Sequence, residues 1–146
     1  MRVAKILLPY HARIAGRLDA RAAAGVATLL VSVHSFTPRL RTRPVDRPWH
    51  IGRCWAAADG FSRHVLGVLA AMEPDLVLGL NEPYDVDMAN DYSIPGHGEG
   101  RRLPYVEIEI RQDQIATPEG QALWAERLVP VLQRAAETFR VPGDRA

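Results

Sequence analysis

A near-continuous apolar run at residues 26–33, VATLLVSV, is the feature that most constrains the fold. Its length and its β-branched side chains predict a strand covered on both faces, as in a parallel sheet. Apolar strands usually stop at Gly, Asn or Pro, but this run ends at His34 and Ser35. A polar pair at the end of a buried strand needs either a structural or a functional reason.

Helix and strand patterns alternate along the rest of the chain. Helices are predicted around residues 10–24, 59–72 and 118–139, and strands at 26–33, 49–55, 76–80 and 105–110. Between the last two strands lies a polar segment, residues 85–102, whose length predicts a functional loop. The order predicts an α/β sheet flanked by helices, in which ligands bind beyond the carboxyl ends of the strands.

Composition narrows the class of protein. The 146 residues are 47% hydrophobic, which fits one domain over residues 1–140 with a tail at 141–146. A net charge of +1 argues against a nucleic-acid or membrane surface. We expect a cytoplasmic protein, because Cys54 is the only cysteine and no signal peptide is recognisable. The densest basic cluster predicts a solvated loop or a groove for an anionic ligand: Arg39, Arg41, Arg43 and Arg47.

Polar groups follow three of the predicted strands. They are His34-Ser35, the NEPY word at residues 81–84, and the EIRQD word that begins at Glu109. A carboxylate on a core strand needs a partner, because an unpaired buried charge is costly. For Glu109 the sequence leaves open a cation, a metal-bound water, or a structural salt bridge to Arg111 on the same strand face.

Structural alternatives exist for each candidate. His34 could cap its strand, the NEPY word could be only a turn, and Glu107 could make Glu109 part of a merely polar face. The other histidines are interpreted as surface or packing residues: His11, His50 and His64. The sequence holds no HExxH-type zinc motif, nucleophile elbow, P-loop or dinucleotide fingerprint.

Taken together, several words resemble the N-formylglutamate amidohydrolase family. They are HSFTP (34–38), RPWHIG (47–52), NEPY (81–84), DYSIPGH (91–97), LPYVEIEIRQD (103–113) and QALWAERL (121–128). The resemblance covers nearly the whole chain, residues 2–132, and its words occur in the family's order.

The resemblance implies a phosphorylase/hydrolase-like α/β fold related to zinc carboxypeptidases. It implies zinc-dependent hydrolysis of N-formyl-L-glutamate to glutamate and formate, a step of histidine degradation. His34 would be a zinc ligand, and Glu109 the catalytic carboxylate that acts on the zinc-bound water. Three more residues would lie near the substrate: Asn81, Tyr84 and His97.

The resemblance is to the second half of longer proteins. Their first half supplies the other zinc ligands and an Asn-Arg word for the substrate carboxylate, and we find neither here. A catalytic zinc normally takes three protein ligands, so we expect these residues alone to be inactive. The chain would then be a truncated enzyme, a short or split-gene product, or a non-enzymatic module for an acyl-amino acid or carboxylate. Missing strands would leave a sheet edge exposed, which predicts pairing with another chain.

Overall fold

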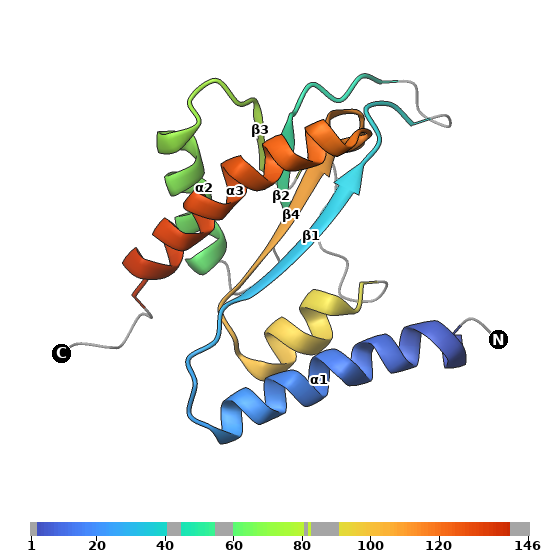
Figure 1. Ribbon diagram of the computed structural model, residues 1–146, viewed down its shortest axis with the longest axis vertical. Coiled ribbons are helices and arrows are strands. Elements are labelled where there is room, and N and C mark those ends of the chain that lie inside the picture. The colour runs from blue at the N-terminus through green and yellow to red at the C-terminus, as the bar shows by residue number, and fades with distance from the viewer. Residues whose placement is uncertain (1–2, 41–44, 55–59, 81, 83–90, 141–146) are drawn as a thin grey trace.

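The computed structural model describes residues 3–40, 45–54, 60–80, 82 and 91–140. The main elements are α1 (Leu8–Ala23), β1 (Leu30–Phe36), β2 (Ile51–Cys54), α2 (Gly60–Met72), β3 (Leu78–Leu80), β4 (Tyr105–Arg111) and α3 (Pro118–Thr138) (Figure 1). Short helical turns are η1 (Val3–Leu7), η2 (Ser93–Gly98), η3 (Glu99–Arg101) and η4 (Gln112–Ile115). None of the helices in these ranges is both long and apolar enough to cross a membrane.

The four strands form one mixed sheet in the order β1-β4-β2-β3. β1 runs parallel to β4, β2 runs parallel to β3, and β2 and β4 are antiparallel. The α/β class with helices flanking a sheet is confirmed, and the first apolar run does form a strand with a parallel neighbour, although the sheet as a whole is mixed. Because β4 takes the inner position next to β1, β1 lies at an edge.

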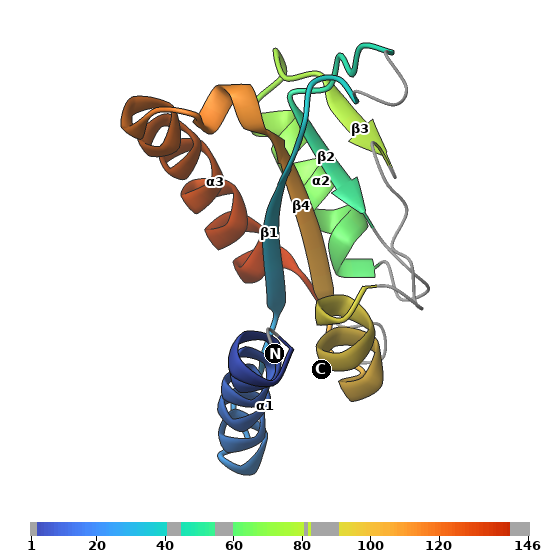
Figure 2. The same ribbon diagram turned by 90° about the vertical axis from the view of Figure 1, so that its right-hand side faces the viewer.

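α2 and α3 pack on one face of this sheet (Figure 2). β4 sends alternate apolar side chains into that core, as a strand does when one face is dry. The buried cluster combines α2, α3 and β4 with β2: Ile51, Phe61, Val65, Leu69, Val106, Ile108, Ile110, Trp124, Leu128, Val131 and Ala135. The core therefore lies between the helices and the middle of the sheet.

The first strand begins later than the apolar run predicts. Its ladder starts where the Leu30 amide donates to the Pro104 carbonyl at 2.9 Å. The preceding residues are held by α1 instead, because the Arg21 guanidinium donates to the Ala27 carbonyl at 2.9 Å and to the Thr28 hydroxyl at 2.9 Å. At its other end β1 extends beyond the predicted strand, through His34 to Phe36.

β1 is also less covered than we expected. Val31 and Val33 remain 36% and 54% exposed. No strand pairs with the outer edge of β1 within the described part of the chain. The expectation of a strand buried on both faces is therefore wrong, because Val31 and Val33 share the α2–α3 face of the sheet through their register with β4, yet stay partly exposed there.

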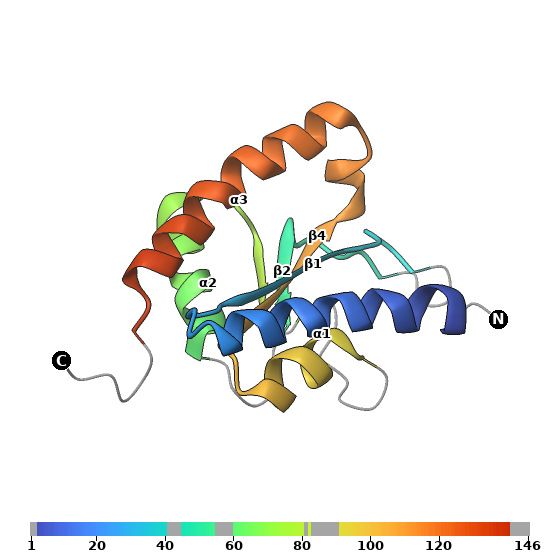
Figure 3. The same ribbon diagram turned by 60° about the horizontal axis from the view of Figure 1, so that its bottom comes forward.

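Part of the predicted loop at residues 85–102 is helical. η2 buries Ile94 completely and is closed by the Gly96 amide, which donates to the Tyr92 carbonyl at 2.8 Å. η3 follows directly, and its Glu99 accepts a 2.6 Å hydrogen bond from the Tyr105 hydroxyl on β4. Figure 3 shows this segment beside α1, next to the end of the sheet where β1 and β4 begin.

Two glycines in helices provide a matched test of the packing. A Cβ at Gly120, near the start of α3, would run into the backbone oxygen of Gln114, whereas a Cβ at exposed Gly67 on α2 would meet nothing. We expect Gly120→Ala to lower the free energy of unfolding by about 1–3 kcal/mol. Gly67→Ala should raise it by about 0.5–1 kcal/mol, because alanine favours helix. Urea denaturation of both variants measures the difference, and equal effects would contradict the described packing.

Candidate active site

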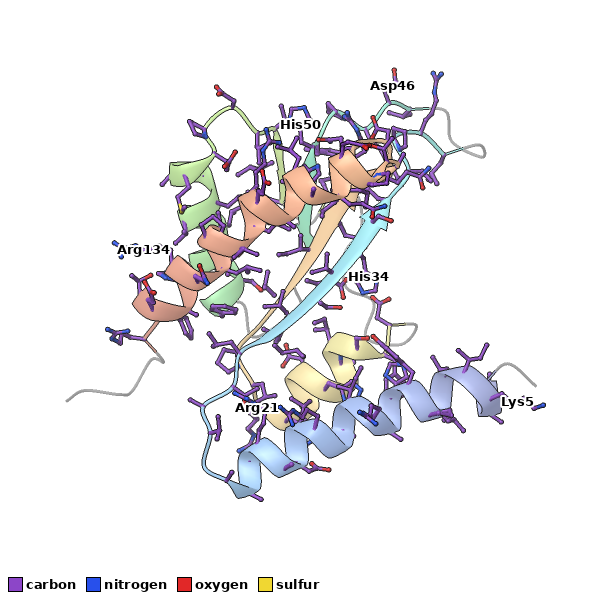
Figure 4. The ribbon with its side chains drawn as sticks, in the orientation of Figure 1. Lys5, Arg21, His34, Asp46, His50 and Arg134 are labelled. Carbon is purple, nitrogen blue, oxygen red and sulfur yellow. The ribbon has the colours of Figure 1, made fainter. Side chains whose placement is uncertain are left out.

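The register of β1 and β4 brings the predicted residues together. His34 pairs with Glu109, and Ser32 pairs with Glu107. Paired residues of neighbouring strands share a face, so the imidazole and both carboxylates lie on the face opposite the α2–α3 core. Figure 4 shows His34 near the middle of β1. We had expected His34 to lie beyond the carboxyl end of its strand. The site instead lies on a face of the sheet.

His34 is held at one nitrogen. Its Nε2 lies 2.9 Å from the Ser32 hydroxyl oxygen and 3.8 Å from Glu107 Oε2. No residue in the described ranges makes a hydrogen bond to its Nδ1. Half of the side chain is exposed, so the imidazole can still receive a ligand from outside the sheet.

Glu109 is the least satisfied group of the cluster. The residue is 7% exposed, and its Oε2 is buried without a hydrogen-bond partner among the described residues. Burial raises the pKa of the Glu109 carboxyl from 4.5 to about 7, and nearby Glu107 and Asp91 raise this pKa as well. His34 and Arg47 act in the opposite direction. A carboxyl with a pKa near 7 can both accept and donate a proton at neutral pH.

Glu107 lies in the same environment. It is 8% exposed. Burial raises the pKa of the Glu107 carboxyl, His34 lowers this pKa, and Asp91 raises it. The two carboxylates thus compete for one neighbouring imidazole in a site that water reaches poorly.

The structure does not show the salt bridge between Arg111 and Glu109 that the sequence left open. Its Nε donates to Asp113 Oδ1 at 2.8 Å. Its guanidinium also reaches the backbone carbonyls of Arg47, Pro48 and Trp49 at 3.3–3.4 Å. Arg111 therefore fastens the segment before β2 to the end of β4, and the carboxylate of Glu109 is left for another role.

A hollow of about 150 Å³ lies beside His34. Its lining comes from α1, β1 and η2: Tyr10, Ile14, Leu30, Val31, Ser32, Val33, His34, Ser93 and His97. His97, predicted near the substrate, does lie in this lining, but it is 4% exposed and its Nε2 faces His11 Nδ1 at 3.1 Å. The other two predicted substrate residues, Asn81 and Tyr84, lie outside the described residues.

Sequence reasoning missed three contributors to the site. Glu107 was noted only as a possible polar neighbour, and Asp91 and Arg47 were noted as members of a polar segment, a basic cluster and two of the family words but not as site residues. Alternation along β4 is a signal for Glu107, since residues two apart share a strand face. No local signal identifies Asp91 or Arg47, because both reach Glu109 from segments distant in sequence.

The described residues do not fit a complete zinc site. No group of three His, Cys, Asp or Glu side chains within the described part of the chain is arranged to hold a metal ion. A catalytic zinc takes three protein ligands and an open position. His34 offers one such nitrogen, and the unpartnered Glu109 oxygen suits a group that handles a proton.

Comparison with known families identifies one family. The family model described as N-formylglutamate amidohydrolase matches residues 1–116. The chain belongs to the N-formylglutamate amidohydrolase family. The match contains both β1 with His34 and β4 with Glu109, so the whole cluster lies inside the family region. A search of curated proteins found no match.

A solved structure has the same fold. The crystal structure of gene product Atu2144 from Agrobacterium tumefaciens is 28% identical in sequence and superposes with a TM-score of 0.83. The similarity covers 94% of this chain and 53% of that protein. The chain thus spans about half the length of this structural relative.

The raised pKa of Glu109 predicts a pH-dependent stability. Because the folded protein holds this proton up to about pH 7 and the unfolded chain releases it near 4.5, the contribution of this carboxyl to stability is fully present below pH 4.5 and is lost as pH rises to about 7. Glu109→Gln removes this loss, so we expect its free energy of unfolding at pH 8 to exceed that of the wild type by up to about 3 kcal/mol.

Urea denaturation at pH 5, 6, 7 and 8 measures this difference. The control is Glu126→Gln, at an exposed position on α3, which should keep the wild-type pH dependence. A Glu109→Gln variant whose stability varies with pH as the wild type does would contradict the buried, unpaired carboxyl.

Proposed function

We propose that this chain carries the general base and one metal-ligand position of an N-formylglutamate amidohydrolase. One observation supports it above the others: the buried carboxylate of Glu109 has an unpartnered Oε2 beside a half-exposed imidazole. A structural carboxylate would be expected to have an ion-pair partner, because burial without one is costly. The family membership supports the substrate class, an N-formyl amino acid with N-formyl-L-glutamate first.

In the proposed reaction Glu109 moves one proton twice. Its ionised Oε2 takes a proton from water, and the water oxygen forms a bond to the formyl carbon. The carbon–nitrogen bond then breaks, and the protonated carboxyl delivers the same proton to the leaving nitrogen. The products are formate and glutamate. A pKa of about 7 suits both transfers, because neither form of the carboxyl is strongly preferred at neutral pH.

We further propose that His34 is one ligand of a zinc ion in the complete enzyme. Its partly exposed imidazole and the contact of Nε2 with Ser32 and Glu107 support this role. The remaining ligands would come from polypeptide corresponding to the half of the Agrobacterium protein that this chain does not span. We place the reaction in histidine degradation and in the cytoplasm.

The second candidate function is binding without turnover. The lack of a three-ligand metal group among the described residues favours it, since a chain without zinc could still bind an acyl-amino acid or another carboxylate. Arg47, which acts electrostatically on Glu109, would attract such an anion. Asn81 and Tyr84 would then contact the bound molecule in either function, and His97, buried against His11, would act from behind the hollow.

Two substitutions test the roles in the complete enzyme, where the missing ligands are supplied. Glu109→Gln should leave zinc content unchanged but lower kcat by about 10²–10⁴-fold, because the base is lost. His34→Ala should lose both zinc and activity, since one of three ligands is gone. Metal analysis of purified protein and formate release measure these outcomes.

The matched controls are Glu126→Gln and His64→Asn, on helices away from the site. Both should keep zinc and turnover. Zinc at wild-type stoichiometry in His34→Ala would show that His34 is not a zinc ligand. Near-normal turnover in Glu109→Gln would show that Glu109 is not the general base, and binding without turnover would then be the better-supported function.

We also propose that the outer edge of β1 pairs with another polypeptide. The exposed Val31 and Val33 support this, because an uncovered edge strand is a template for pairing. Val33→Lys should reduce self-association of the chain measured by analytical ultracentrifugation, because a charged side chain on an edge opposes pairing. Val129→Lys, at a 52% exposed position on α3, is the control. Equal association of both variants would place the contact elsewhere.

A further inference from the structure

A buried histidine pair lies behind the hollow next to His34. His11 on α1 and His97 in η2 are 6% and 4% exposed, and His11 Nδ1 lies 3.1 Å from His97 Nε2. The Tyr92 ring covers His11 with ring centroids 4.0 Å apart, and Tyr10 approaches His11 edge-on at 5.0 Å. This pair thus links two segments that are 86 residues apart in sequence.

The contact permits few protonation states. A hydrogen bond between two imidazole nitrogens needs one N–H donor and one lone pair. A pair with no added proton or with one can meet this need, because one facing nitrogen can stay unprotonated. A doubly protonated pair cannot, since two N–H groups would face each other at 3.1 Å.

Within the described part of the chain, no carboxylate forms an ion pair with His11 or His97 that would offset a second positive charge on the pair. Among the described residues, the other ionisable groups around the pair are Tyr10 on α1, Tyr92 before η2, His34 on β1, Tyr105 on β4, and Glu99 in η3, whose carboxylate accepts a hydrogen bond from the Tyr105 hydroxyl. Arg101 in η3 adds a positive charge and is itself paired with Asp19 on α1. Burial first, then His11 and Arg101, lower the pKa of His97.

We propose that His11 and His97 are positioning residues that fasten η2 against α1 and so shape the hollow beside His34, and that protonation of both rings releases this contact. His97 then acts through the placement of Ser93 and the η2 backbone rather than by touching the substrate. The connection with catalysis rests on the proposed function, whereas the contact and its release do not.

Hydrogen exchange of the chain tests the proposal without any turnover. The reporters are amides of residues 93–98, including the Gly96 amide bonded to the Tyr92 carbonyl. Exchange is measured between pH 7.5 and 5 and corrected for the intrinsic rate. Protection of this segment should decrease once the pH is lower than the ordinary histidine pKa of about 6.5. Uptake of one proton on opening predicts a decrease of about tenfold per pH unit. The α3 amides should not show this decrease.

Variants at His11 separate hydrogen bonding from titration. The amide of Asn can donate or accept near the place of Nδ1 but does not titrate, so His11→Asn should keep protection at pH 5 close to its value at pH 7.5. His11→Phe should lose protection at both values. His64→Asn, which changes a histidine outside the pair, should behave as the wild type does.

Each result decides the matter. Constant wild-type protection from pH 7.5 to 5, or a His11→Asn variant that loses protection as steeply as the wild type, would overturn the proposal. Nitrogen-15 spectra at pH 7.5 give a second test that needs no variant: they should show one protonated and one unprotonated nitrogen in the facing pair. Retained exchange behaviour together with near-normal turnover of Glu109→Gln in the complete enzyme would refute the proposed function and leave the pair in place.

Discussion

The architecture depends on β4 carrying two different faces along one buried strand. Val106, Ile108 and Ile110 enter the core under α2 and α3, and Glu107 and Glu109 point to the other side with 8% and 7% exposure. Burying carboxylates is unfavourable. The packing of the apolar face of β4 against α2 and α3 therefore has to offset the free-energy cost of burying the two carboxylates on its other face. The raised pKa of Glu109 is the measure of that cost.

The position of β1 at the edge determines how the site opens. β4 shields the carboxylates from one side, while His34 on β1 stays half exposed. An outside ligand, whether substrate, metal ion or another polypeptide, can therefore reach the imidazole before it reaches Glu109. The same geometry leaves Val33 uncovered, so access to the site and exposure of the sheet edge have one cause.

α1 and η2 complete the surroundings without belonging to the main core. They meet through the His11–His97 contact and the tyrosine rings around it. This contact is polar and buried, and it depends on protonation more than the apolar contacts between α2, α3 and the sheet do. The wall of the hollow should therefore be the part of the fold that responds first to acid.

Local patterns predicted most of the elements correctly. Periodicity identified the three helices, and Thr117 caps α3 as its position before Pro118 predicts: its hydroxyl accepts a 3.2 Å hydrogen bond from the Gly120 amide. The boundary of β1 was missed because Arg21 binds the residues before it. η2 was missed because its helical turn depends on burial of Ile94 rather than on a periodic pattern.

The sequence by itself determined the family and the α/β class, and it singled out His34 and Glu109 as candidate site residues, since each depends on residue types in a fixed order. Tertiary structure decided their partners. It placed Arg111 on Asp113 rather than on Glu109, brought Glu107 to His34, and joined His11 to His97. The physical reason is that pairing across strands and between distant segments is set by register and packing, which no local stretch of sequence contains.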